Sequence, residues 1–164
     1  PLLKPAFRKD GTVTAANSSS ISDGAAALVM MRRSTADSLG LKPLATVVGH
    51  STHAQEPALF TTAPVGAIRK LFEKTGWSAD KVDLYEINEA FAVVAEKFIR
   101  DLDLDRAKVN PNGGAIALGH PIGATGAILI GTALDELERT GGRYGLITMC
   151  AAGGMAPAIV IERV

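Results

Sequence analysis

Residues 82–100 read VDLYEINEAFAVVAEKFIR, and this stretch decides the fold class. Val82–Ile87 is a short run suited to a strand, whereas the apolar residues of Glu89–Arg100 recur at a helical period. Asn88 lies between the two, at a position where a helix N-cap is wanted. A strand that leads through a short polar turn into a helix predicts a layered α/β domain.

The flanking sequence repeats this alternation of strands and helices. Val65–Thr75 is the clearest helix, followed by the stop signal Gly76, and Ala124–Arg139 predicts another. Residues 151–154 suit a hairpin between two strand-like runs. Ala25–Met31 is apolar throughout and fits either a buried strand or a buried helix. The other expected elements are a helix at Ser34–Leu39 and strands at Leu44–Val48, Tyr144–Met149 and Ala158–Ile161.

The composition is that of an ordinary globular chain: 164 residues, 47% hydrophobic and 21% charged, enough for one sizeable core. Seventeen basic and seventeen acidic residues cancel, so we expect neither nucleic acid nor a membrane as a partner. The longest apolar run, Ala25–Met31, is too short to span a bilayer. The single Cys150 excludes an internal disulfide and suits a reducing compartment, which predicts a cytoplasmic location. The start at Pro1 suits a processed product or a fragment.

Two stretches hold polar residues at the ends of predicted strands, where a core does not need them. Asn88 is most simply a helix N-cap, although its amide equally suits a water or an oxyanion, and Glu89 is expected in the first helical turn. Residues 112–126 read NGGAIALGHPIGATG and hold His120 in a glycine-rich turn before a helix. The spacing is not that of a dinucleotide or P-loop motif and includes no lysine. Both a structural and a catalytic role for His120 therefore stay open.

A third stretch, residues 149–155, reads MCAAGGM. A cysteine directly after an apolar strand is usually a small buried hydrophobe. Because a turn of small residues follows, Cys150 could instead project into a site, with free backbone N–H groups beside it as oxyanion donors. Together with His120, Cys150 indicates nucleophilic or acid–base catalysis.

These stretches, in this order, resemble the C-terminal half of thiolases, and residues 12–27 are similar to the thiolase segment that contacts the pantetheine arm of coenzyme A. The resemblance implies an α/β fold with a mixed five-stranded sheet and helices on both faces. Ala25–Met31 would be its first strand, and Ala124–Arg139 its buried central helix. The chain would divide into the end of the pantetheine-contacting segment, residues 1–24, and a thiolase C-terminal domain, residues 25–164.

The resemblance also implies a ping-pong reaction with coenzyme A thioesters as substrates, without cofactor or metal. A cysteine of the N-terminal half, outside this chain, takes an acyl group, and the enolate of a second acyl-CoA attacks it. His120 would activate that cysteine and donate to the thioester oxygen, while Asn88 would hold the water that supplies a second donor. Cys150 would move the α-proton, and the Ala152 N–H would help form the other oxyanion hole. A neighbouring imidazolium or helix N-terminus would lower the thiol pKa toward neutrality.

The same matching assigns residues to the substrate. Ala15 and Ser19 would face the pantetheine, and Phe7 would lie near the nucleotide end or the tunnel mouth. Phe60, Ala90 and Phe91 would line the acyl pocket, although core packing explains such apolar positions as well. Three departures from the usual family pattern bear on substrate size more than on the reaction: Ala152 for Gly, Thr125 for Ser and Ser20 for Gly.

We therefore expect part of an acyl-CoA C-acetyltransferase, with acetoacetyl-CoA slightly favoured because Gly153-Gly154 resembles the biosynthetic pattern. A long-chain 3-ketoacyl-CoA thiolase and a sterol-carrier-type thiolase stay open. The alternative is a non-catalytic CoA-thioester-binding or dimerisation module with the same fold. The implied partners are the missing N-terminal half, an acyl-CoA or acetyl-CoA, and further copies in a dimer or tetramer. By itself the chain is expected to be inactive, because the nucleophile lies elsewhere.

Overall fold

The computed structural model describes residues 3–164, and within these residues the sheet has four strands in the order β1-β4-β3-β2. Their bounds are β1 Ala45–Ala54, β4 Met155–Arg163, β3 Tyr144–Thr148 and β2 Leu84–Ile87. The β1–β4 and β4–β3 pairs are antiparallel, and the β3–β2 pair is parallel. The sheet is therefore mixed, with the predicted hairpin between β3 and β4.

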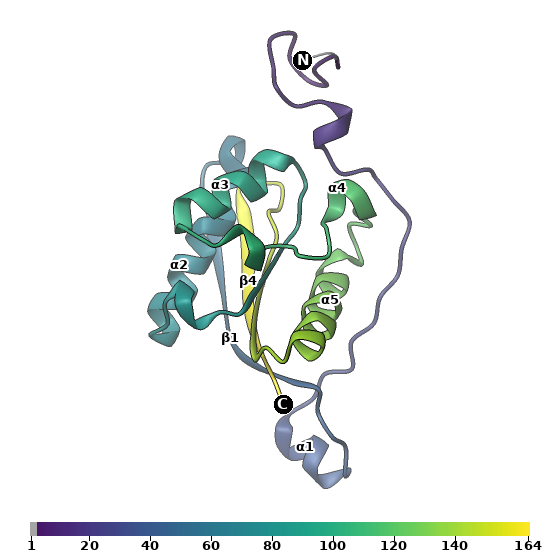
Figure 1. The fold of residues 1–164 in the computed structure, drawn as a ribbon, viewed down its shortest axis with the longest axis vertical. Helices are drawn as coiled ribbons and strands as arrows, with labels where there is room; N and C mark the ends of the chain where they lie inside the picture. The colour runs from purple at the N-terminus through teal and green to yellow at the C-terminus, as the bar shows by residue number, and fades with distance from the viewer. Residues whose placement is uncertain (1–2) are drawn as a thin grey trace.

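Helices cover both faces of this sheet, as predicted (Figure 1). On one face, α2 (Ala63–Thr75) and α3 (Ala92–Leu102) pack over a cluster that includes Tyr85 and Ile87 of β2. On the other face, α5 (Thr125–Thr140) packs over a smaller cluster that includes Leu84. Successive side chains of β2 point to opposite faces, so this short strand joins the two cores.

Glycines end both long helices near the predicted positions. Gly76 follows α2 with a φ of 68°, and Gly141 follows α5 with a φ of 75°. This left-handed conformation satisfies the last helical carbonyls at little cost for a residue without Cβ. The predicted short helix is present as α1, Arg33–Ser38. The remaining helical segments are α4, Ala115–Leu118, and 3₁₀ turns at Ala15–Asn17, Pro57–Thr62, Ala79–Lys81 and Arg106–Lys108.

The expected five-stranded sheet is wrong for the described residues, because Ala25–Met31 forms neither a strand nor a helix. Within residues 3–164 its backbone makes no hydrogen bond, and its apolar side chains are exposed, with Val29 89% accessible. The segment runs past α4 and α5 on the outside of the domain toward α1 (Figure 1). A strand needs a neighbouring strand, and the described residues offer none here. The predicted division at residue 24 stays a prediction, and residues 1 and 2 lie outside the described part.

Asn110 closes the edge of the sheet beside β2. Val109 makes a single parallel bridge to Tyr85, and within the described residues the pairing does not extend into a strand. The Asn110 side chain accepts from the N–H of Ile87 at 2.8 Å and donates to the Ile87 carbonyl at 2.9 Å. One amide side chain therefore occupies the hydrogen-bonding groups that a fifth strand would use.

The predicted start of the helix that follows β2 is corrected. The helix expected at Glu89–Arg100 begins at Ala92, and its N-cap is Phe91. Asn88 is therefore not a helix cap, and Glu89 is not in the first helical turn. Residues 88–91 form a loop instead, which frees the Asn88 side chain for another contact.

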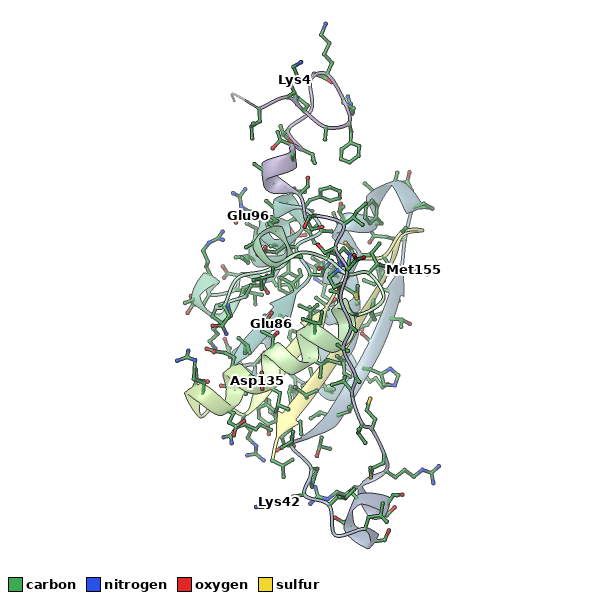
Figure 2. All side chains as sticks on the ribbon, turned by 90° about the vertical axis from the view of Figure 1, so that its right-hand side faces the viewer. Lys4, Lys42, Glu86, Glu96, Asp135 and Met155 are labelled. Carbon is green, nitrogen blue, oxygen red and sulfur yellow. The ribbon has the colours of Figure 1, made fainter. Side chains whose placement is uncertain are left out.

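Glu86 is a buried carboxyl group within β2, with 1% of its surface exposed, and Figure 2 labels its position. It points to the α5 side of the sheet, and its Oε1 has no hydrogen-bond partner among residues 3–164. Burial, with smaller contributions from Glu89 and Glu136, raises the pKa of Glu86 from 4.5 to about 8. Glu86 is therefore protonated in the folded chain at neutral pH, because an isolated buried charge is costly.

Glu86→Gln is expected to gain stability relative to the unchanged chain as pH rises. The folded chain holds the Glu86 proton more tightly than the unfolded chain, so its contribution is complete below pH 4.5 and is lost toward pH 8. Glutamine matches the protonated acid and does not titrate. The difference in free energy of unfolding should therefore grow by up to about 5 kcal/mol across this range. Urea unfolding at several pH values measures it.

The matched control is Glu96→Gln, which removes a carboxylate that pairs with Arg106 on the surface of α3. Its difference from the unchanged chain should stay nearly constant over the same pH range, because exposed pairs contribute little. Parallel stability curves for Glu86→Gln and the unchanged chain would contradict a protonated Glu86.

Among residues 3–164, none of the helices has the length and apolarity that crossing a membrane requires.

Candidate active site

The three predicted catalytic residues lie on loops at one end of the sheet. Asn88 follows β2, and Cys150 comes two residues after β3, which runs parallel to β2. The Asn88 N–H donates to the Thr148 carbonyl at 3.1 Å, which holds the two loops side by side. Figure 2 shows Met155, where the chain enters β4, at the upper end of the sheet, and Lys42 at the opposite end. The carboxyl ends of parallel strands are the usual place for a binding site in α/β sheets.

Asn88 and His120 are in direct contact although 32 positions separate them in sequence. Nδ2 of Asn88 lies 3.3 Å from Nε2 of His120, and Nδ1 of His120 lies 2.7 Å from Oγ1 of Thr125. The Thr125 hydroxyl donates its own hydrogen to the Pro121 carbonyl at 2.9 Å, so it accepts from His120. This pattern assigns the imidazole proton to Nδ1 and leaves Nε2 as an acceptor.

The His120 ring is neutral in this arrangement. Burial lowers its pKa, because the charged form loses solvation. The Nε2 lone pair accepts from Nδ2 of Asn88, so Nε2 takes a proton only from a group that displaces this hydrogen bond. Once it is protonated, both ring nitrogens donate, and Nε2–H requires an acceptor other than the Asn88 NH₂ group. His120 can therefore act as a proton acceptor when neutral and as a hydrogen-bond donor through Nε2 when protonated, as its two predicted roles require.

Backbone contacts with residues 18–22 hold His120 in position. The His120 N–H donates to the Ser20 carbonyl at 3.0 Å, and Ile21 forms a parallel bridge with His120. Gly119, directly before it, has a φ of 91°, and a Cβ there would overlap the Ser22 hydroxyl. Only glycine permits this backbone approach. The predicted pantetheine segment and the His120 turn are thus one packed unit.

The Asn88 amide has one unused polar atom. Asn88 is fully buried, and its Oδ1 has no hydrogen-bond partner within the described residues. An unpaired buried oxygen is costly unless a donor reaches it, so Oδ1 suits a donor from outside the described residues. The amide is thus poised between a contact to His120 through Nδ2 and an unfilled acceptor position at Oδ1. Its predicted role in holding a water stays a prediction.

Cys150 is buried, with 6% of its surface exposed, within the core cluster under α2 and α3. Burial raises its pKa, so the resting side chain is a thiol. This is opposite to the lowering expected from an imidazolium or helix N-terminus, because removal from water dominates in this chain. A raised pKa makes the thiolate scarce at neutral pH and a stronger base when it forms.

The turn after Cys150 carries free backbone donors. Ala151 and Met155 exchange two backbone hydrogen bonds of 2.7 and 3.2 Å, which closes the hairpin. Among residues 3–164 the exposed Ala152 N–H has no hydrogen-bond partner, as an oxyanion donor requires. Gly154 lies against the backbone of Gln55, where a Cβ would overlap its carbonyl oxygen. The hairpin therefore keeps Ala152 at the surface of the site.

Five of the six predicted substrate-binding residues lie in the Asn88 loop, in contact with it, or against the same core cluster. The N–H and hydroxyl of Ser19 donate to the Ala90 carbonyl at 3.0 and 3.2 Å. The rings of Phe7 and Phe91 meet edge to face at 6.1 Å, and Phe7 is 75% exposed. Phe60, on the 3₁₀ turn Pro57–Thr62, packs with Ala90 and Phe91 against the core cluster that contains Cys150. Ala15 is exposed on the first 3₁₀ turn, and no contact of its side chain supports or excludes its role.

Glu89 and the imidazole-orienting role of Thr125 were missed by sequence reasoning. Thr125 was noted only as a departure from a family pattern, although its spacing of five residues from His120 across a proline turn suits such a bond. Glu89 was assigned to the dipole of its own helix, whereas it contacts a different segment. Among the described residues, none of the His, Cys, Asp and Glu side chains gather in a group of three that could hold a metal ion.

Two models of one protein family together match most of the chain. A sequence model of the thiolase C-terminal domain matches residues 41–163, and one of the thiolase N-terminal domain matches residues 1–34. The chain therefore belongs to the thiolase family, and its fold is that of the thiolase C-terminal region. Within the family it is homologous to acetyl-CoA acetyltransferases: the enzyme of Chromobacterium violaceum is 51% identical over 161 residues, which are 98% of this chain and 41% of the relative.

Two solved structures support the same relationship. The acetyl-CoA acetyltransferase of Bacillus anthracis is 48% identical with a TM-score of 0.96, and covers 99% of this chain and 41% of its own. Human mitochondrial 3-ketoacyl-CoA thiolase, solved in complex with CoA, is 39% identical with a TM-score of 0.91 and the same coverage. The chain thus spans 41% of the length of the relatives it matches.

Proposed function

We propose that this chain is the acid–base part of an acyl-CoA C-acetyltransferase, which condenses acyl-CoA thioesters and cleaves 3-ketoacyl-CoA in reverse. The contact between Asn88 and His120, with the imidazole oriented by Thr125, carries the proposal. A core-building role requires neither a buried amide with an unused oxygen nor a histidine held from both sides. The relatives named acetyl-CoA acetyltransferase support this reaction class.

His120 acts in both halves of the proposed reaction. Its Nε2 takes the proton of the nucleophilic cysteine supplied by the N-terminal part, whose thiolate then attacks the thioester carbonyl. The carbon–sulfur bond of the thioester breaks, the thiolate of coenzyme A leaves, and His120 keeps the proton. In the second half, Nε2–H donates to the thioester oxygen of the incoming acetyl-CoA. A water on Asn88 provides the second donor. Each donor aimed at the developing enolate oxygen raises the rate of enolate formation by a factor of about 10²–10³.

Cys150 moves the proton in the second half. Its thiol first loses its proton to solvent, and the resulting thiolate takes an α-proton from acetyl-CoA. The enolate carbon then bonds to the acyl carbon on the nucleophile, which gives a tetrahedral intermediate. The carbon–sulfur bond of the acyl-enzyme breaks, and its electron pair returns to the nucleophilic sulfur. The Ala152 N–H stabilises the oxyanion of this tetrahedral intermediate. Burial of Cys150 makes its thiolate a strong base, and the oxyanion donors lower the acidity gap with the substrate.

Substrate preference follows from the residues beside the Asn88 loop. Phe60, Ala90 and Phe91 line the acyl group, Ala15 and Ser19 face the pantetheine, and Phe7 covers the tunnel mouth. The relatives include enzymes named for acetyl-CoA and a 3-ketoacyl-CoA thiolase, and we favour acetoacetyl-CoA. The full assembly is a dimer or tetramer that includes the N-terminal part. We keep the cytoplasm as its location, although one relative is named as mitochondrial.

The experiment joins this chain to the N-terminal part of the Chromobacterium violaceum relative, replacing the matched C-terminal part; this chimera is called the completed protein below. We expect the completed protein to cleave acetoacetyl-CoA with CoA, and the 164-residue chain alone to show no cleavage, because the nucleophile is absent. The loss of acetoacetyl-CoA absorbance measures both. A folded completed protein that binds CoA without turnover would favour the non-catalytic binding module.

A further inference from the structure

Glu89 joins two loops that carry proposed catalytic residues. It directly follows Asn88 and lies in the loop between β2 and α3. Its Oε1 accepts from Nδ2 of Asn110 at 3.1 Å, and its Oε2 accepts from the N–H of Ile116 at 3.4 Å. Ile116 belongs to α4, the helical turn that ends at Leu118, two residues before His120. One carboxylate thus spans the Asn88 loop and the segment that delivers His120.

The fit around this carboxylate is tight. A Cβ at Gly114, the N-cap of α4, would overlap the carboxyl group of Glu89, so a side chain there would displace the carboxylate from its present position. Asn110, on the other side, is itself fixed by two hydrogen bonds to the Ile87 backbone. The carboxylate therefore connects an anchored strand end to α4 through one hydrogen bond on each side. Such packing over-determines the positions of both loops.

We infer that Glu89 is a positioning residue, which sets the spacing between the Asn88 amide and the His120 imidazole and so builds the oxyanion site. It touches no substrate and acts only through these two residues. Both of its oxygens accept from N–H donors, as a carboxylate does. The inference rests on the proposed function of Asn88 and His120. It assigns to Glu89 the enolate-forming step and not substrate affinity.

Glu89→Gln in the completed protein tests this inference. The NH₂ group of glutamine faces the N–H of either Asn110 or Ile116, so one of the two hydrogen bonds is lost and two donors oppose each other. We expect the kcat for α-proton exchange of acetyl-CoA in deuterated buffer to fall about tenfold to hundredfold, as small misplacements of reacting groups do. KM for acetyl-CoA should stay within about twofold. Glu89→Asp keeps two acceptors and should restore part of the rate.

The control and the double variant separate positioning from a general structural effect. Glu96→Gln removes the same charge from α3, where Figure 2 labels it, and should leave exchange unchanged. In an Asn88→Ala background, Glu89→Gln should lower the remaining rate by less than about threefold, because one of the two groups whose spacing it sets is gone. If Glu89→Gln does not fold, Glu89→Asp is compared in both backgrounds instead.

Three results would overturn the inference. The first is a normal kcat in folded Glu89→Gln, and the second is an equal loss in the Asn88→Ala background. The third is a rise in KM that accounts for the whole loss. Full exchange activity in Asn88→Ala alone would remove the proposed role of Asn88 itself, and the inference with it.

Discussion

Replacing Cys150 by alanine in the completed protein is expected to lower α-proton exchange of acetyl-CoA by about 10²–10⁴-fold, the usual contribution of a positioned acid–base group. Acetylation of the nucleophilic cysteine by acetyl-CoA should continue at a near-normal rate, because that half-reaction uses His120 and not Cys150. Mass spectrometry of the acetylated protein measures the first half-reaction. Deuterium uptake into the acetyl methyl group measures the second.

Cys150→Ser is the matched control for this prediction. Serine keeps the size of the side chain nearly unchanged, so the core cluster under α2 and α3 should stay packed. Its hydroxyl is a far weaker acid than a thiol, so its anion is not available near neutral pH, and exchange should fall almost as far as in the alanine variant. Normal exchange in either variant would show that another group moves the proton. Loss of acetylation as well would indicate that the change disturbs the whole site.

The elements that the sequence predicts well are those with a local cause. For α2, the apolar period and Gly76 are both local, and the helix lies within two residues of its predicted start and ends where expected. The hairpin after Cys150 follows likewise from its small residues, with Gly153 and Gly154 both at a φ of 87°. Composition and spacing suffice where the physical reason lies within one stretch of chain.

The wrong predictions concern segments whose structure depends on a distant partner. Ala25–Met31 has the composition of a buried strand, yet within residues 3–164 no strand pairs with it. At the open edge of β2, the side chain of Asn110 pairs with the N–H and carbonyl of Ile87, a contact that no periodicity reveals. Asn88 was read as a cap for the same reason, because its contact with His120 comes from 32 positions away. Local propensity cannot anticipate such long-range contacts.

The residues of the candidate site were found by resemblance, whereas their arrangement came from the fold. Matching motifs proposed Asn88, His120 and Cys150, but not that Thr125 assigns the imidazole proton to Nδ1. The expected lowering of the Cys150 pKa is wrong, because its direction depends on burial under two helices that the motif does not contain. Glu89 lacked a signal of its own, since its partners lie in other segments. Chemistry at the site is therefore a property of packed loops rather than of any one motif.

His120→Ala in the completed protein should slow both half-reactions, unlike the changes at Cys150. It removes the base for the nucleophilic cysteine and one donor to the enolate oxygen, so thiolysis of acetoacetyl-CoA should fall by about 10³-fold or more. Both acetylation by acetyl-CoA and deuterium uptake should decline. A normal rate of acetylation would restrict His120 to the oxyanion site, and normal rates in both assays would return it to a structural role.

Thr125→Val tests the orientation of the His120 imidazole, because the ring itself is kept. Valine has nearly the same shape but cannot accept the Nδ1–H hydrogen bond that Thr125 receives at 2.7 Å. The loss of one hydrogen bond of ordinary strength corresponds to a decrease of up to about tenfold, far less than the loss of the ring. Because the Nδ1–H bond fixes which nitrogen holds the lone pair, acetylation and exchange should fall together in Thr125→Val. A change in only one of the two rates would show that the Thr125 contact does not set the protonation of His120.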